Sequence, residues 1–117
     1  MLNLDTHVVV YAVEGSLTRR ELRRMSAEPL GISAIVFWEL AKLVQLGRLE
    51  IDLDEVGLLL EALHVWPLDL EIARASTRLD FRSDPADEII AATSVVHGAP
   101  LVTRDRKLLR SRVVPLA

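Results

Sequence analysis

The sequence contains no cysteine among its 117 residues, and this absence excludes several kinds of site. Disulfide frameworks, thiol nucleophiles, and zinc or iron–sulfur sites built on cysteine are all ruled out. Histidine is scarce as well, and no two of the three histidines stand four residues apart, which excludes a zinc site of the H-E-x-x-H type. We expect packed or surface positions, not acid–base catalysis, for His7 and His64, and a position at a helix C-terminus for His97.

Positive charge is in short supply, because the net charge is −3 and the isoelectric point is about 5.6. A nonspecific basic coat for nucleic acid is therefore absent, although a bound cation can invert a local negative field. No apolar run reaches the roughly 20 residues that are needed to cross a bilayer. Residues 1–5 carry no basic segment of the secretory type, so we expect a cytoplasmic protein that does not bind a membrane.

Half of the residues are hydrophobic, which is enough for a folded core and excludes a disordered chain. No repeat or linker divides the sequence, so we expect a single domain over residues 1–117. Short apolar segments alternate with helical patterns, and this alternation is typical of an α/β fold with a parallel sheet. The expected strands cover residues 2–5, 29–32, 64–68, 99–103 and 112–115. The expected helices cover residues 6–13, 18–27, 34–46 (capped by Ser33), 53–63, 69–79, 85–96 and 105–110.

Two aspartates stand where such a fold places its chemistry, near the carboxyl ends of strands, and a third stands at the start of a helix. Asp5 closes the first expected strand, and Asp105 follows the strand over residues 99–103. Asp87 lies in the first turn of the helix that Asp84 precedes. Each aspartate also has an ordinary structural interpretation, as a helix cap or as a first-turn acid that the helix dipole favours.

Glu39 is a fourth acid, and helix capping does not explain it. At 100° per residue it falls at the centre of the apolar stripe of its helix, together with Ile35, Val36 and Leu43. An isolated buried carboxylate costs several kcal/mol unless it is paired, protonated or bound to a metal. A salt bridge to a buried arginine, or a position at the rim of the helix, is the alternative.

If the four acids converge, their mutual repulsion raises their pKa values, and a divalent cation is the ordinary remedy. Ligands that are all oxygen favour Mg²⁺ or Mn²⁺ over zinc or copper, and a water activated by such an ion suits phosphodiester hydrolysis. Thr6 and Thr103 lie beside acids, where a hydroxyl can orient a carboxylate or cap a helix. Asn3 is interpreted as a strand residue that faces a neighbouring element.

Four segments carry these acids along nearly the whole chain. They read LDTHVVVY (4–11), SAIVFWELAK (33–42) with LGRL (46–49), DPAD (84–87) with IAAT (90–93), and LVTRD (101–105). In this order they resemble the PIN-domain ribonucleases, and most closely the VapC-type toxins of bacterial toxin–antitoxin pairs.

The resemblance implies a PIN-like three-layer α/β/α sandwich around a mostly parallel sheet of about five strands. It implies a Mg²⁺- or Mn²⁺-dependent endoribonuclease with an RNA substrate, which forms a homodimer and is held inactive by a cognate antitoxin. By motif position, Asp5, Glu39 and Asp87 match the three core acids of the family. Asp105 matches the fourth, more variable acid, and Thr103 matches the hydroxyl residue that accompanies it.

The sequence departs from the family pattern at three places. Residues 14–28 form a short connection, Glu88 stands where a basic residue often follows the third acid, and residues 108–109 are leucines where an aromatic is common. These departures concern the rim of the substrate site and the shortened helical segment within residues 14–28 more than they concern the metal centre.

Basic and aromatic residues supply further candidates. The group beside the fourth acid is a candidate for contact with RNA phosphates and consists of Arg104, Arg106 and Lys107. Arginines over residues 19–24 form a solvated face or a contact with RNA or antitoxin. Trp38 and Trp66 are expected in the core or in dimer packing.

Two other functions remain open. A Mg²⁺-binding phosphoacceptor module that resembles response-regulator receivers also gathers acids at strand ends, but it normally has paired acids after the first strand, which residues 3–6 lack. A PIN fold that binds RNA or a partner without cleaving is the second alternative, and the full set of acids argues against it.

Overall fold

In the computed structural model, which describes residues 1–117 apart from the side chain of residue 59, a parallel sheet of four strands lies among helices. Its strands are β1 (Leu2–Leu4), β2 (Leu30–Ser33), β3 (His64–Trp66) and β4 (Leu101–Val102). Their order is β3-β2-β1-β4, and every pairing is parallel. The expected α/β fold is therefore confirmed.

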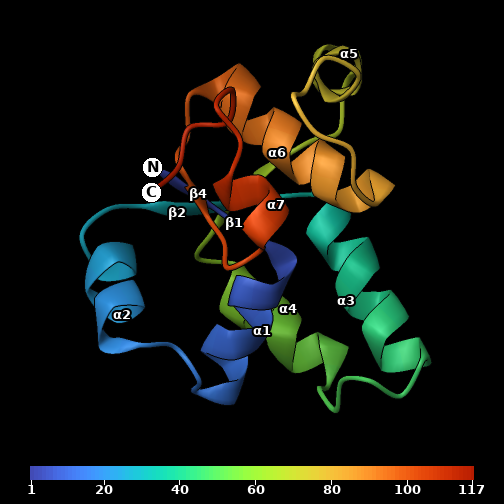
Figure 1. Cartoon of the computed structure of the whole chain (residues 1–117). Helices are drawn as coiled ribbons and strands as arrows, with labels where there is room; N and C mark the ends of the chain where they lie inside the picture. Colours follow the sequence, from blue (N-terminus) through green and yellow to red (C-terminus); the bar gives the residue numbers. More distant parts are fainter.

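Helices connect the strands and cover both faces of the sheet. They are α1 (Thr6–Glu14), α2 (Arg19–Ser26), α3 (Ile35–Gln45), α4 (Leu53–Leu60), α5 (Leu70–Ser76), α6 (Pro85–His97) and α7 (Arg106–Leu109). Figure 1 shows α5 and α6 on one side of the sheet, α1, α2 and α4 on the other, and the two chain ends close together. None of the described helices is long and apolar enough to cross a membrane.

Local sequence signals explain several helix boundaries. Thr18 and Glu21 form a reciprocal capping box at the start of α2, in which each residue's side chain accepts a hydrogen bond from the other's amide. Pro85 lies in the first turn of α6, and Gly98 ends that helix in the left-handed conformation, with φ at 62°. At α3, Ala34 takes the expected place of Ser33 as N-cap residue, although the Ser33 hydroxyl still accepts from the Ile35 amide at 3.3 Å.

The prediction of a fifth strand over residues 112–115 is wrong. This segment pairs with β4 only through an isolated bridge between Leu101 and Leu116. The Ser111 hydroxyl accepts hydrogen bonds from the Val113 and Val114 amides. The Asp80 carboxylate accepts a hydrogen bond from the Arg112 amide at 2.7 Å. These side chains satisfy backbone donors that a strand would use, so the segment forms a turn.

Two predicted helices end earlier than expected, α4 at Leu60 and not at residue 63, and α5 at Ser76 and not at residue 79. At the end of α5, the hydroxyls of Ser76 and Thr77 donate to backbone carbonyls three residues earlier, at 2.6 and 2.7 Å. Hydroxyls that bond locally in this way compete with the helical hydrogen-bond ladder. Side-chain chemistry at the helix end therefore accounts for the shorter α5.

Apolar side chains between the sheet and the helices form the core. The largest of those that are fully buried include Leu2, Ile32, Leu40, Ile90, Leu101 and Leu108. Asn3 of β1 is also fully buried, and its Nδ2 donates to the Ile90 carbonyl at 3.0 Å and to the Ser94 hydroxyl at 2.9 Å. Asn3 therefore ties β1 to α6, as expected of a strand residue that faces a neighbouring element.

Gly31 of β2 lies directly against Trp66. A Cβ atom at this position would stand 2.6 Å from Trp66 Cζ3, and Trp66 is itself buried and stacked on His97 with ring centroids 5.5 Å apart. We expect Gly31→Ala to lower the free energy of unfolding by about 1–3 kcal/mol through overpacking, measured by chemical denaturation. Gly57→Ala, where a Cβ would meet open space in α4, is the control and should be neutral or stabilising. Equal loss in both variants would contradict the tight contact with Trp66.

Candidate metal centre

Asp5 follows β1 directly and is only 3% exposed. It occupies the N-cap position of α1, but its carboxylate makes no capping hydrogen bond, so the interpretation of Asp5 as a helix cap is wrong. Its Oδ2 accepts a hydrogen bond from Thr103 Oγ1 at 2.7 Å, whereas its Oδ1 is buried and has no partner among the described residues. A buried carboxylate oxygen without a partner is costly, and a cation or a water molecule would relieve that cost.

Glu39 lies on α3 and is held by the first residue of α1. Thr6 Oγ1 donates to Glu39 Oε1 at 2.5 Å. The buried face of α3 contains Val36 and Leu40, and Glu39 lies half-buried at its margin. The prediction that Glu39 stands at the centre of the apolar stripe is therefore wrong, because the apolar residues near the C-terminus of the helix, such as Leu46 at 63% exposed, are not covered.

The remaining acids lie at the starts of α6 and α7. Asp87 is half-buried in the first turn of α6 and accepts from the Ser83 hydroxyl at 2.9 Å. Asp105 is the N-cap residue of α7 and accepts from the Lys107 amide at 2.8 Å, so its capping interpretation is confirmed. Asp84 stands at the N-cap position of α6, but its side chain makes no capping hydrogen bond.

The four carboxylates act on one another through their charges. Burial is the main cause that raises the pKa of Asp5, and the charge of Asp105 adds to it. Burial also raises the pKa of Glu39 most, and the charges of Asp87 and Asp5 raise it further. The pKa of Asp87 is raised by burial and then by Asp5 and Asp105. These effects show that the charges of the four acids act on one another across the fold.

The donor set fits a hard divalent cation by its chemistry. It consists of carboxylate oxygens, one of them the unpartnered Oδ1 of Asp5, and such oxygens are ligands for Mg²⁺ or Mn²⁺. Within the part of the chain that the structure describes, no three acidic or histidine side chains converge tightly enough to form a ready-made metal site. Hydroxyls hold three of the acids instead: Thr103 on Asp5, Thr6 on Glu39 and Ser83 on Asp87.

A hollow of about 230 Å³ opens beside two of the acids. Its lining residues are Asp5, His7, Tyr11, Arg104 and Asp105. His7 is expected at a packed or surface position, and Tyr11 is not among the site residues predicted from the sequence. These two residues are four apart on the helix that begins directly after Asp5, so helical periodicity puts them on one face, and that signal points to both.

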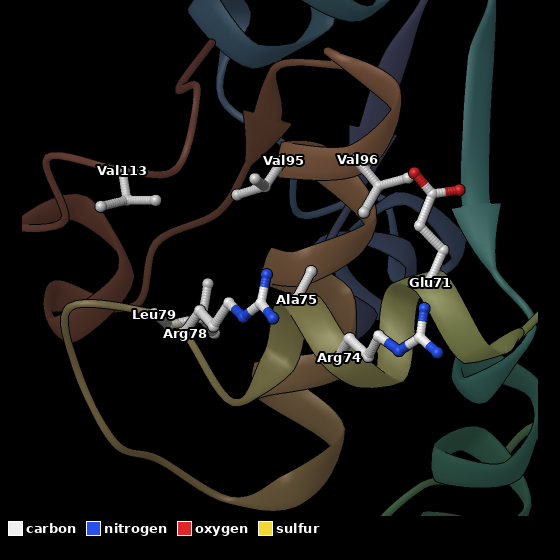
Figure 2. A pocket seen from close by; sticks show the side chains of 8 residues that line it. All are labelled: Glu71, Arg74, Ala75, Arg78, Leu79, Val95, Val96 and Val113. Carbon is white, nitrogen blue, oxygen red and sulfur yellow. The ribbon is translucent and has the colours of Figure 1, made fainter.

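A larger hollow, of about 430 Å³, lies between α5, α6 and the segment near the C-terminus (Figure 2). Its lining includes Arg74, Arg78 and Val113. None of the four acids takes part in it, so it is separate from the candidate metal centre.

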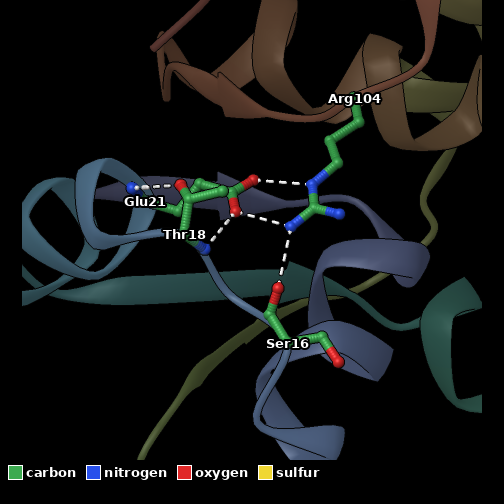
Figure 3. A network of polar contacts seen from close by, with 4 residues as sticks. All are labelled: Ser16, Thr18, Glu21 and Arg104. Carbon is green, nitrogen blue, oxygen red and sulfur yellow. Dashed lines mark hydrogen bonds and ion pairs between the residues drawn. The ribbon is translucent and has the colours of Figure 1, made fainter.

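Arg104 differs from the other two basic residues that were predicted to contact RNA. Figure 3 shows its guanidinium forming two hydrogen bonds with the Glu21 carboxylate and one with the Ser16 carbonyl. Arg106 is exposed, and Lys107 Nζ makes only a long contact, of 3.4 Å, with the Arg82 carbonyl. Glu21 is not among the residues predicted from the sequence, because its contact with Arg104 spans 83 residues of sequence.

The other candidates lie at the surface or in the core. Trp66 is 6% exposed and belongs to the core, whereas Trp38 is 55% exposed, so core packing is wrong for Trp38. In the cluster over residues 19–24, Arg24 forms an ion pair with Glu28 at 2.7 Å. His7, His64 and His97 are all exposed, and His97 ends α6 as expected.

Comparison with known proteins places this chain in a family. The family model described as the PIN domain matches residues 3–113. Ribonuclease VapC22 of Mycobacterium tuberculosis is 35% identical over 91 residues, which cover 74% of this chain and 70% of that protein.

Two solved structures have a similar fold. VapBC2 of Rickettsia felis, bound to a DNA fragment from its promoter, matches with a TM-score of 0.79 and 19% identity, over 100% of this chain and 98% of that one. A toxin–antitoxin complex from Klebsiella pneumoniae matches with a TM-score of 0.73 and 22% identity, over 94% of this chain and 91% of that one. From the family match and the curated relative together, the chain belongs to the PIN domain family.

Proposed function

We propose that this chain, as one domain over residues 1–117, is a metal-dependent endoribonuclease and the toxin of a toxin–antitoxin pair. The observation that carries the proposal is the buried, unpartnered Oδ1 of Asp5 beside a hollow that Asp105 also lines, in a chain of the PIN family. A relative that is a ribonuclease and neighbours that are toxin–antitoxin complexes support it. Membership of the PIN family removes the receiver-like alternative.

In this proposal, Asp5, Glu39 and Asp87 hold a Mg²⁺ or Mn²⁺ ion, and Asp105 completes the acidic ring. When bound, the ion would supply positive charge that offsets the repulsion among the acids and would lower the pKa of a water molecule, so that this water could lose a proton and serve as the nucleophile.

Hydroxyls of this chain orient all three proposed ligands, and Ser83 donates to Asp87. Thr103 fixes Asp5 through Oδ2 and leaves Oδ1 free, and Thr6 fixes Glu39. Hydrogen bonds of this kind to ligating carboxylates set their direction before the ion arrives and reduce the cost of ordering them.

The substrate side of the site is basic. Arg104, Arg106 and Lys107 lie beside Asp105, where their charges can bind the phosphates of an RNA strand that reaches the acids. We also propose a cognate antitoxin and a second copy of the chain as partners. Phe37 and Trp38 on α3, at 41% and 55% exposed, support a protein-binding surface there.

The purified protein tests this proposal directly. We expect it to cut a structured RNA such as tRNA at internal positions in Mg²⁺ or Mn²⁺, to leave it intact in EDTA, and to lose activity when it is purified with its antitoxin. Gel analysis with end mapping measures the products. Intact RNA under every metal condition would instead favour a PIN fold that binds without cleaving, and undiminished cleavage in EDTA would contradict metal dependence.

A further inference from the structure

We infer that Glu21, on α2, is a positioning residue that holds Arg104 in the orientation in which it binds an RNA phosphate beside Asp105. The inference rests on the proposed function, because it concerns the substrate side of the same site. It makes α2, which carries none of the four acids of the candidate metal centre, part of the RNA-binding surface.

The contact between the Glu21 and Arg104 side chains is a bidentate ion pair (Figure 3). Arg104 Nε donates to Glu21 Oε2 at 2.9 Å, and Arg104 Nη2 donates to Glu21 Oε1 at 2.6 Å. Nη2 also donates to the Ser16 carbonyl at 3.1 Å. Two parallel hydrogen bonds of this type fix the plane of a guanidinium group and not merely its distance.

Tyr11 holds the same guanidinium from a third direction. The central carbon of the Arg104 guanidinium lies 3.9 Å from the centroid of the Tyr11 ring. This cation–π contact covers one face of the group. The position, plane and facing of Arg104 are therefore all determined by residues of α1 and α2.

One part of Arg104 remains available. Its Nη1 donates no hydrogen bond to any described residue, and Arg104 lines the hollow that Asp5 and Asp105 also line. A guanidinium whose one edge is paired with a carboxylate can still bind a phosphate oxygen through its free N–H groups. A phosphate of the bound RNA, placed in this hollow, would meet those donors next to the acids.

The Glu21 side chain is also held by a residue of its own helix start, independently of Arg104. Its Oε1 accepts the Thr18 amide at 2.8 Å, and the Glu21 amide donates to Thr18 Oγ1 at 3.1 Å. The hydrogen bonds from Arg104 are the main cause that lowers the pKa of Glu21 to about 2, so the carboxylate stays charged at neutral pH. The capping box at the start of α2 therefore fixes the Glu21 carboxylate in the position from which it binds Arg104.

The direction in which Glu21→Gln changes RNA affinity distinguishes a positioning role for Glu21 from a simple effect of its charge. Removing a negative charge near an RNA site ordinarily tightens binding, because repulsion of the phosphates is removed. Glu21→Gln keeps the capping box, which glutamine also forms, but weakens the hold on Arg104. We expect it to weaken RNA binding about threefold despite the lost negative charge.

The experiment measures binding of a fluorescent single-stranded RNA oligonucleotide by anisotropy, in EDTA so that the RNA is not cut. We expect Arg104→Gln to raise the Kd about tenfold and to reduce the slope of log K against log salt concentration by about 0.7, the value for one phosphate contact. Glu50→Gln and Arg48→Gln change the same charges at exposed positions and serve as controls that leave binding nearly unchanged. Thermal unfolding verifies that each variant is folded.

The double variant completes the test. If Glu21 acts only through Arg104, then Glu21→Gln combined with Arg104→Gln binds no more weakly than Arg104→Gln alone. In cleavage assays with Mg²⁺, Glu21→Gln should raise KM and leave kcat nearly unchanged.

Tighter or unchanged RNA binding by Glu21→Gln, or additive losses in the double variant, would overturn the inference. If the unmodified protein cuts RNA with Mg²⁺ while either of these results is obtained, the proposed function stands and only the role of Glu21 fails. If the unmodified protein neither binds nor cuts RNA, both fail.

Discussion

Asp5→Asn is expected to lower the rate of RNA cleavage by about 10³-fold and to leave the fold intact. Asparagine retains an oxygen that can accept the Thr103 hydroxyl, but it removes the negative charge and the second carboxylate oxygen, which is buried without a partner. The charge and that oxygen are what a divalent cation needs from this position. Initial rates of cleavage at saturating Mg²⁺, with circular dichroism to verify folding, measure the effect.

Asp52→Asn is a matched control for this substitution. Asp52 is an exposed N-cap residue of α4, where it accepts the Asp54 amide at 2.9 Å. Asparagine caps helices as well as aspartate does, so the same chemical change at Asp52 should leave both stability and cleavage unchanged. Cleavage by Asp5→Asn at the unmodified rate would reject the assignment of Asp5 and point to another nuclease in the preparation.

Glu39→Gln is expected to change activity and stability in opposite directions. It should lower cleavage about 100-fold, because a proposed metal ligand loses its charge. Without metal it should raise the melting temperature by roughly 2–4 °C, because it removes a half-buried charge that Asp87 and Asp5 repel, while the amide oxygen still accepts the Thr6 hydroxyl. Calorimetry in EDTA measures the gain, and a smaller rise in melting temperature on adding Mg²⁺ accompanies it.

The pH dependence of that gain provides a check. The pKa of Glu39 is raised in the folded state, so between its unfolded and folded pKa values the folded protein binds more protons than the unfolded chain. The stability that protonated Glu39 contributes is therefore complete below the unfolded pKa and is lost as the pH rises through the folded pKa. The advantage of Glu39→Gln over the unmodified protein should shrink as the pH falls from neutral towards the ordinary pKa of a glutamate side chain. An advantage that does not change with pH would show that charge repulsion is not its cause.

Much of the fold could be predicted because its elements carry local signals. β1, β3 and β4 lie within their expected segments, and β2 extends one residue beyond its expected segment, to Ser33. Short apolar runs between helical patterns are typical of buried parallel strands. Asp69 caps α5, and Pro85 and Gly98 mark the two ends of α6, so local chemistry accounts for these helix boundaries. The expected strand over residues 112–115 fails because Asp80, some 30 residues earlier, accepts a hydrogen bond from its backbone, and no local pattern records such a contact.

The sequence by itself determined which acids stand at the starts of helices that follow strands, because strand ends and helix starts are set by neighbouring residues. It did not determine which groups hold them. Thr6 is adjacent to Asp5 but donates to Glu39, and Asp5 is held by Thr103, 98 residues away. Only the packing of α1 against α3, and the pairing of β1 with β4, decided these contacts, because hydrogen bonds require a distance and an angle that depend on how distant elements are placed. The same holds for Glu21 and Arg104, whose ion pair exists only once α2 and the end of β4 are brought together.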